Sequence, residues 1–253
     1  MNLPKNYISY NQIRQYQTCP KKYYYSYIEN IQTPINEHIF LGTVFHSVVE
    51  YYLNHRIAGN LLEKEAVLEQ FNELFASLQE GKEVIWKTSE TANRDRGLAF
   101  VRYFVKEMAS SLDPLMVEKE LEVDVPRVGV KLRGIIDMVE KDFSITDFKT
   151  TTSRWSSERI RGSILQMVIY KYLFEKSFGN VGSELKLIIV YSKNGANIRH
   201  QLHSMRSRDA NMEKMFDIIQ WVAENVSKGI FNKNESYACS FCDFFDICKK
   251  TIN

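Results

Sequence analysis

Between Leu115 and Thr150, apolar side chains recur at every second residue, as in a strand. The segments before Leu115 show the three- or four-residue spacing of a helix instead. In the first part of 115–150, acidic residues alternate with apolar residues, and the apolar residues are Val117, Leu121, Val123 and Val125. This alternation predicts a strand over 115–125, and two more strands are predicted over 128–139 and 143–150, joined by a tight turn at 140–142. Three consecutive strands indicate a sheet at the centre of the fold.

Helical spacing is found on both sides of these strands. We expect two short helices that meet at Cys19, because Ser9 and Gln12 form a capping pattern and Pro20 interrupts the helix. The remaining expected elements are helices 43–57, 62–80 and 91–111 before the strands, then helix 163–178, strands 184–192 and 197–203, and helix 207–228. Strands with helices on both sides predict a mixed α/β core.

Composition limits the class of protein. The 253 residues are 44% hydrophobic and 25% charged, with only 5 Pro and 11 Gly, which excludes disordered, collagen-like and disulfide-scaffold chains. No apolar run approaches the roughly 20 residues of a membrane span, and the first residues do not resemble a signal peptide. We therefore expect a cytoplasmic protein without a membrane partner. The net charge of +2 by itself says nothing about nucleic acid.

The hairpin formed by the second and third strands is expected to hold a pair of acids. If the turn has three loop residues, Asp137 lies opposite Asp147, and Lys149 shares a face with Asp147. Two neighbouring carboxylates repel each other unless a cation lies between them, and Mg²⁺ prefers one or two carboxylates together with water and phosphate oxygens. The alternative is an ordinary Asp–Lys pair on the surface of an edge strand.

Four sequence elements, in this order along the chain, resemble those of the PD-(D/E)xK nuclease superfamily and its RecB-like branch. They are Phe45-His46, Gly134-Ile-Ile-Asp137, Ile145-Thr-Asp147-Phe-Lys149-Thr150 and Gln166-x-x-x-Tyr170. The resemblance extends from about Ser9 to Cys248 and implies a restriction-endonuclease-like core, a mixed central sheet flanked by helices.

The resemblance also implies roles for these residues. His46, Asp137 and Asp147 would ligate Mg²⁺ or Mn²⁺, Lys149 would be the catalytic lysine, and Gln166 and Tyr170 would line the substrate side. Asp147 is a mild departure, because many CRISPR-associated relatives have Glu there. Taken alone, His46 could equally be a core residue, and the four-residue spacing of Gln166 and Tyr170 also arises from ordinary helix packing.

The four cysteines suggest a second metal centre. Cys239, Cys242 and Cys248 are closely spaced, and in a reducing compartment they favour a metal over disulfides. Spacing leaves Zn²⁺ and an iron-sulfur cluster open, whereas the resemblance implies a 4Fe-4S cluster completed by Cys19. The link would close a loop of 220 residues (239 minus 19), which adds on the order of 5 kcal/mol to stability.

Aromatic and basic residues after the third strand are candidates for binding DNA. Trp155 lies among Arg154, Arg159 and Arg161, a combination that stacks bases and neutralises phosphates in single-strand grooves. The alternative places Trp155 in the core. The tyrosines between 23 and 27 are at least as easily explained as a buried cluster.

Taken together, the sequence predicts a Mg²⁺- or Mn²⁺-dependent DNA exonuclease that acts on single strands or strand ends. The resemblance, which is to CRISPR-associated exonucleases in particular, implies CRISPR spacer acquisition, with adaptation proteins as partners, or DNA recombination or repair as the setting. The expected division is a helical region 1–112 that supplies His46 and Cys19, a nuclease core 113–230 and an iron-sulfur tail 231–253. The alternative is a non-catalytic DNA-binding or scaffold module with a structural zinc site on the four cysteines.

Overall fold

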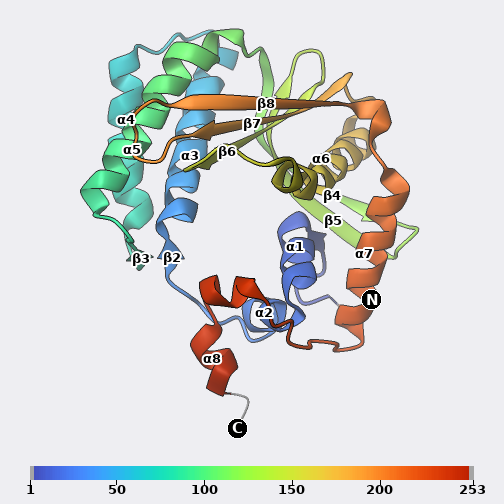
Figure 1. The fold of residues 1–253 in the computed structure, drawn as a ribbon. Helices are drawn as coiled ribbons and strands as arrows, with labels where there is room; N and C mark the ends of the chain where they lie inside the picture. Colours follow the sequence, from blue (N-terminus) through green and yellow to red (C-terminus); the bar gives the residue numbers. More distant parts are fainter. Residues whose placement is uncertain (1–2, 251–253) are drawn as a thin grey trace. The chain divides into compact units, whose positions relative to one another are not determined.

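The computed structural model describes residues 3–250, so the first two residues of the expected helical region and the last three of the expected tail lie outside it (Figure 1). The chain forms two compact units, each built from separate segments. The terminal unit combines the residues up to Thr33 with Leu121–Gly134 and the residues from Asn211 onward. The central unit combines Pro34–Glu120 with Ile135–Ala210.

A mixed sheet of six strands forms the core of the fold. Its order is β1-β5-β6-β7-β8, with β4 also paired to β5. The strands are β1 (Ile8–Ser9), β4 (Pro114–Val125), β5 (Val130–Glu140), β6 (Ile145–Thr151), β7 (Glu184–Tyr191) and β8 (Arg199–Arg206). Strands β5 and β6 are antiparallel, β6 and β7 are parallel, and β7 and β8 are antiparallel. This arrangement confirms the predicted mixed α/β core with a central sheet flanked by helices.

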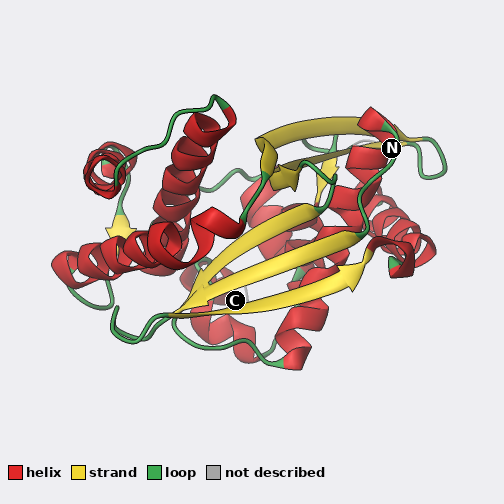
Figure 2. Ribbon diagram, turned by 90° about the horizontal axis from the view of Figure 1, so that it is seen from above, coloured by secondary structure: helices red, strands yellow, loops and turns green. Residues whose placement is uncertain are grey.

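The helices of the central unit cover both faces of β7. Its buried side chains alternate, so that Ile188 and Val190 join one hydrophobic core and Leu187 and Ile189 join another. The first core contains residues of α3 (Glu37–Ile57), α4 (Lys64–Gln79) and α5 (Glu90–Tyr103). The second contains Ile160 from α6 (Ser157–Phe178). Figure 2 shows these helices around the strands.

Close packing fixes α3, α4 and α5 to one another. A Cβ added at Gly97 of α5 would lie 2.6 Å from the ring of Phe71 of α4, so only glycine permits this approach. Phe45, Phe71 and Phe104 are almost fully buried between the helices. Two short strands, β2 (Ile35–Asn36) and β3 (Val84–Ile85), pair beside the start of α3. The chain continues from α5 through a π-helical turn and a 3₁₀ turn to Ser111.

The terminal unit is mainly helical. It contains α1 (Tyr10–Thr18), α2 (Pro20–Tyr23) with a π-helical turn to Ile28, α7 (Met212–Ser227), a 3₁₀ turn (Tyr237–Phe241) and α8 (Phe245–Lys250). Ser9 caps α1 by accepting a hydrogen bond from the Gln12 N–H, as expected. Tyr16 packs edge-on against Tyr23, which is fully buried. The tyrosine segment therefore contributes to the core.

The structure changes the bounds of several predicted elements. Helix α6 begins at Ser157 rather than 163, because Ser156 accepts a hydrogen bond from the Arg159 N–H and starts the helix earlier. Strand β8 continues to Arg206, and α7 begins only at Met212, after a 3₁₀ turn. The two-residue strands β1, β2 and β3 were not predicted, because they are too short to show a period. Within residues 3–250, no helix combines the length and the apolar character needed to cross a bilayer.

Candidate active site

The β5–β6 hairpin positions the predicted pair of acids. Met138 pairs with Thr146 and Val139 with Ile145, and the same register places Asp137 opposite Asp147. Next to this position the Phe148 N–H donates to the Asp137 carboxylate (N to Oδ2, 2.7 Å). The Asp137 side chain is thereby held against the backbone of β6.

Asp147 is a fully buried carboxylate that forms an ion pair with Lys149. The Lys149 Nζ atom donates to Asp147 Oδ1 at 2.9 Å and lies 2.8 Å from Oδ2. Oδ2 is nevertheless buried without a hydrogen bond of adequate geometry. Burial raises the pKa of Asp147 to about 6, with Lys149 opposing the shift and Asp137 adding to it. A buried oxygen of this kind is suited to a positively charged ligand.

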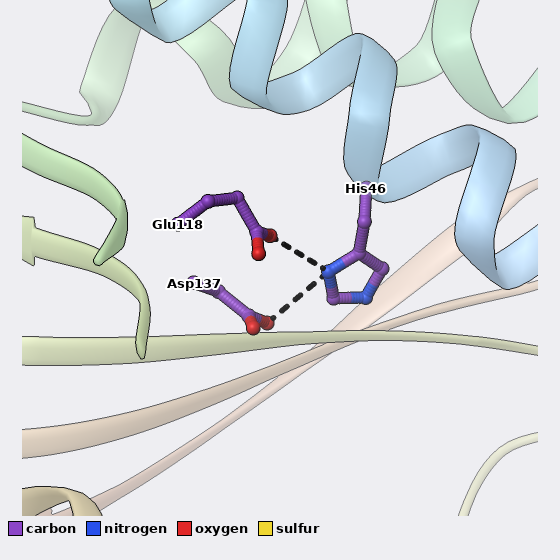
Figure 3. A group of neighbouring side chains, drawn as sticks. All are labelled: His46, Glu118 and Asp137. Carbon is purple, nitrogen blue, oxygen red and sulfur yellow. Dashed lines mark hydrogen bonds and ion pairs between the residues drawn. The ribbon is translucent and has the colours of Figure 1, made fainter. Parts of the chain in front are cut away.

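His46 brings α3 to the acids. Its Nδ1 atom lies 3.4 Å from Asp137 Oδ2 and 3.4 Å from Glu118 Oε1 (Figure 3). Burial alone would lower the pKa of His46, but the Asp137 carboxylate and the hydrogen bond with Glu118 outweigh it and raise this pKa to about 9. Burial also raises the pKa of Asp137, against the effects of His46 and Lys149. The three side chains are strongly coupled by charge.

Glu118 is a site residue that the sequence did not indicate. One ligand atom each from His46, Glu118 and Asp137 lies within 4.8 Å of the others, the only such group in the described part of the chain. The backbone of Glu118 has a φ of 45° within β4, a strained conformation for a non-glycine residue. The one trace in the sequence is the interrupted alternation of β4, because Lys119 occupies the position where an apolar residue would follow Val117.

The predicted third ligand, Asp147, is outside this group of three, but the charges of Asp137, Lys149 and His46 all act on it. Helix α6 supplies the two remaining predicted residues. The Gln166 Nε2 atom donates to the Tyr170 hydroxyl at 2.7 Å, and both side chains are buried. Burial and the nearby Asp147 and Asp137 raise the pKa of Tyr170 well above its usual value. Tyr170 therefore stays protonated beside the acids.

These donors suit a hard divalent cation. An imidazole and the carboxylates of Glu118, Asp137 and Asp147 form a nitrogen and oxygen set of the type that Mg²⁺ and Mn²⁺ accept. The residues of the central unit thus fit such an ion.

Trp155 lies in the core, as in the alternative to its predicted role of stacking DNA bases. It is 8% exposed and packs against Ile160, Leu187 and Ile189. The Arg159 guanidinium covers one face of its ring, 4.3 Å from the ring centre. A base could reach that face only after Arg159 had moved. Arg154, Arg159 and Arg161 are exposed, and Arg161 also pairs with Glu158 at 2.8 Å.

All four cysteines line one cavity of about 580 Å³ in the terminal unit. None forms a disulfide, and each is half-buried. The Asn234 N–H donates to Cys19 Sγ at 3.5 Å. The aromatic side chains of Tyr25, Phe241, Phe244 and Phe245 also line this cavity. The fold therefore brings Cys19 to the three cysteines near the C-terminus.

Comparison with known proteins identifies the family. The sequence matches the PD-(D/E)XK nuclease superfamily over residues 7–249, and the chain therefore belongs to this superfamily. None of the curated proteins compared shows a significant match.

One solved structure agrees with this fold. A protein of Eubacterium rectale, provisionally described as an exonuclease, superposes with a TM-score of 0.59 at 14% identity, covering 94% of this chain and 87% of its own. The structure of SSO0001 superposes with a TM-score of 0.39 at 15% identity, covering 86% of this chain and 87% of its own. Rai1 of Scheffersomyces stipitis superposes with a TM-score of 0.29 at 10% identity, covering 88% of this chain and 68% of its own. Of these three structures, only the Eubacterium rectale protein is similar enough to support the fold.

Proposed function

We propose that this nuclease is a Mg²⁺- or Mn²⁺-dependent DNA exonuclease that acts on single strands or strand ends. The observation that carries the proposal is the convergence of His46, Glu118 and Asp137 next to the buried Asp147–Lys149 pair. The membership of the nuclease superfamily supplies the reaction class, hydrolysis of a phosphodiester bond.

In this proposal, His46, Glu118, Asp137 and Asp147 hold the metal. A bound divalent ion polarises the phosphate and lowers the pKa of a water molecule. Lys149, kept in place by Asp147, orients the attacking water and offsets negative charge on the scissile phosphate. Tyr170 and Gln166 present hydrogen-bond donors on the substrate side. Asp137 is fixed by the Phe148 N–H, so that the metal ligands are positioned before substrate arrives.

The proposed path of DNA passes the start of α6. Arg154, Arg159 and Arg161 are exposed there and would neutralise backbone phosphates, with Trp155 supporting Arg159 from below. Membership of the RecB-like branch is part of the proposal. So is a role in CRISPR spacer acquisition with adaptation proteins, or in recombination or repair, in the cytoplasm.

We further propose that the four cysteines bind a 4Fe-4S cluster rather than zinc. All four cysteines line the same cavity, which supports their acting as ligands of one shared centre. The cavity and its aromatic lining offer space and a partly apolar shell for a cluster. In this proposal, region 1–112 supplies His46 and Cys19, and region 113–230 supplies the acids. Region 231–253 supplies the other three cysteines.

The test is a cleavage assay on single- and double-stranded DNA labelled at either end. We expect Mg²⁺ or Mn²⁺ to support stepwise shortening of single strands and a chelator to stop it. Glu118→Gln and Lys149→Ala should both lose this activity, whereas the exposed control Glu120→Gln should keep it. Binding of DNA without any metal-dependent cleavage would contradict the proposal and favour a non-catalytic module.

A further inference from the structure

Arg96 of α5 is a buried cation with few partners. Its side chain is 7% exposed, and a guanidinium carries five N–H donors. In residues 3–250, its one side-chain hydrogen bond runs from Nη2 to the Asn93 side-chain oxygen. Burial lowers the pKa of Arg96, and Glu37 opposes this effect. A guanidinium buried in this way is costly unless an anion completes its surroundings.

Glu37 does not neutralise Arg96 directly. Its Oε2 atom accepts hydrogen bonds from the Lys87 N–H at 2.9 Å, the Thr88 N–H at 3.2 Å and the Asn93 side chain at 3.0 Å. This carboxylate is therefore occupied in holding the start of α3 to the segment before α5. Asn93 connects the two charges, with its NH₂ group directed to Glu37 and its oxygen to Arg96.

Arg96 lines a small cavity together with His38, with three consecutive threonines and with two apolar residues, namely Thr150, Thr151, Thr152, Leu41 and Phe100. Its volume is about 10 Å³, which is close to the space that one water molecule requires. A single phosphate oxygen could enter, with the rest of the phosphate outside. Hydroxyl and guanidinium donors are the groups that bind phosphate oxygens in proteins.

The surroundings of this cavity are positively charged. His38 is half-exposed on its side-chain atoms, and Arg96, Lys87 and Arg159 all lie near enough to disfavour its protonation, after burial itself. Only Glu37 acts in the opposite direction. Arg96 in the lining, with Lys87 and Arg159 close to His38, gives this place a positive charge that attracts an anion.

The cavity is next to the candidate active site within the central unit. Thr151 follows Lys149 by two residues of β6, about 7 Å along a strand. His38 precedes His46 by eight residues of α3, about 12 Å and a little over two turns, which places both on one side of the helix. Between the histidines, Gly42 has no side chain, and a Cβ there would meet only Thr150 Oγ1, at 3.6 Å. Helix α3 and strand β6 pack against each other, so the two elements that carry His46 and Lys149 also carry His38 and Thr151 (Figure 1).

We propose that Arg96, His38 and the hydroxyl groups of Thr150 to Thr152 bind the backbone phosphate that neighbours the scissile one. This inference rests on the proposed nuclease function and deepens it. The substrate it defines is a strand with a charged phosphate on each of two successive linkages, one at the metal and one at Arg96. A strand whose second linkage carries no charge is a poor substrate.

The test uses single-stranded oligonucleotides in which one linkage is a neutral methylphosphonate, placed next to the cleaved bond on either side. For the wild-type protein, we expect kcat/KM to fall at least tenfold when the neutral linkage is on one of the two sides. Arg96→Met should lose at least tenfold on the ordinary strand and show no further loss on the neutral one. The control Arg94→Met, on the exposed side of the same helix, should behave like the wild type. An equal effect of the neutral linkage in the wild type and in Arg96→Met would overturn the inference.

Two further measurements keep the test decisive. If Arg96→Met does not fold, Thr150→Val removes one hydroxyl at nearly constant shape and should reduce the effect of the neutral linkage at least threefold; an unreduced effect would count against the subsite. Absence of cleavage by the wild type would contradict the proposed function alone. In that event, binding of a trinucleotide in chelator is compared with binding of its form carrying one neutral linkage. Weaker binding of the neutral form by the wild type but not by Thr150→Val or Arg96→Met supports the subsite, and equal binding by the wild type refutes it.

Discussion

Glu118→Gln should weaken metal binding strongly although it changes only one atom. The substitution keeps the shape of the side chain and removes one negative charge from a group of ligand atoms lying within 4.8 Å of one another. An ion held among these atoms lies closer than 4.8 Å to Glu118, so at an effective dielectric constant of about 20 the lost attraction is at least about 3.5 kcal/mol per unit of its charge. The side chain of Glu118 is 24% exposed, so solvent screening reduces this attraction, and we expect about half of the value for one unit of charge. The predicted effect is roughly a 10- to 30-fold weaker affinity for Mn²⁺.

The measurement is calorimetric titration of the purified protein with Mn²⁺. Glu120→Gln is the matched control, because it makes the same change two residues further along β4 on an exposed side chain. We expect its Mn²⁺ affinity to stay within about twofold of the wild type, which is the scale of a remote surface charge. Unchanged affinity in Glu118→Gln, or the same loss in both variants, would refute the reasoning that the strained backbone of β4 serves to place a ligand.

Three other variants test separate parts of the account. Lys149→Ala should lower the cleavage rate at least a hundredfold and leave DNA affinity within about threefold, because Lys149 acts on the reacting groups. The control is Lys141→Ala, and equal losses of cleavage rate and of DNA affinity in Lys149→Ala would contradict that role. Trp155→Ala should lower the free energy of unfolding by about 3 to 5 kcal/mol in a denaturant titration, because it empties a buried site, and an unchanged stability would return Trp155 to an exposed stacking role. Cys19→Ala should remove most of the iron from anaerobically purified protein and lower its Tm. If Cys19→Ala held as much iron as the exposed control Ser240→Ala, Cys19 would be ruled out as a ligand.

The sequence was sufficient for the part of the site that depends on local pairing. The turn of three residues between Glu140 and Ser144 fixes the hairpin register, and the register follows from counting. Asp137 and Asp147 could therefore be placed opposite each other, with Lys149 beside Asp147, before any coordinates were known. The helices and the β7–β8 pair were predictable for the same reason, because their periods are long enough to recognise.

The sequence was insufficient where the geometry depends on one backbone angle or on distant segments. Glu118 reaches His46 because its φ is positive, and the acidic alternation around it conceals this residue among solvent-exposed neighbours. Arg96 is one of three arginines in and around α5, and only the packed structure shows that it is the buried one. The aromatic and basic pattern near Trp155 suits an exposed groove and a core equally well, and the packing of Ile160 and Leu187 decides for the core.

The most direct test of the central claim is to locate the metal in crystals soaked in Mn²⁺, using anomalous diffraction. The account predicts a manganese peak about 2.1 Å from ligand atoms of His46, Glu118 and Asp137, with Asp147 completing the protein ligands. The same crystals of Glu118→Gln should show this peak with clearly reduced occupancy. A manganese ion bound elsewhere, with no peak among these side chains, would contradict the assignment of this cluster as the metal centre of the nuclease.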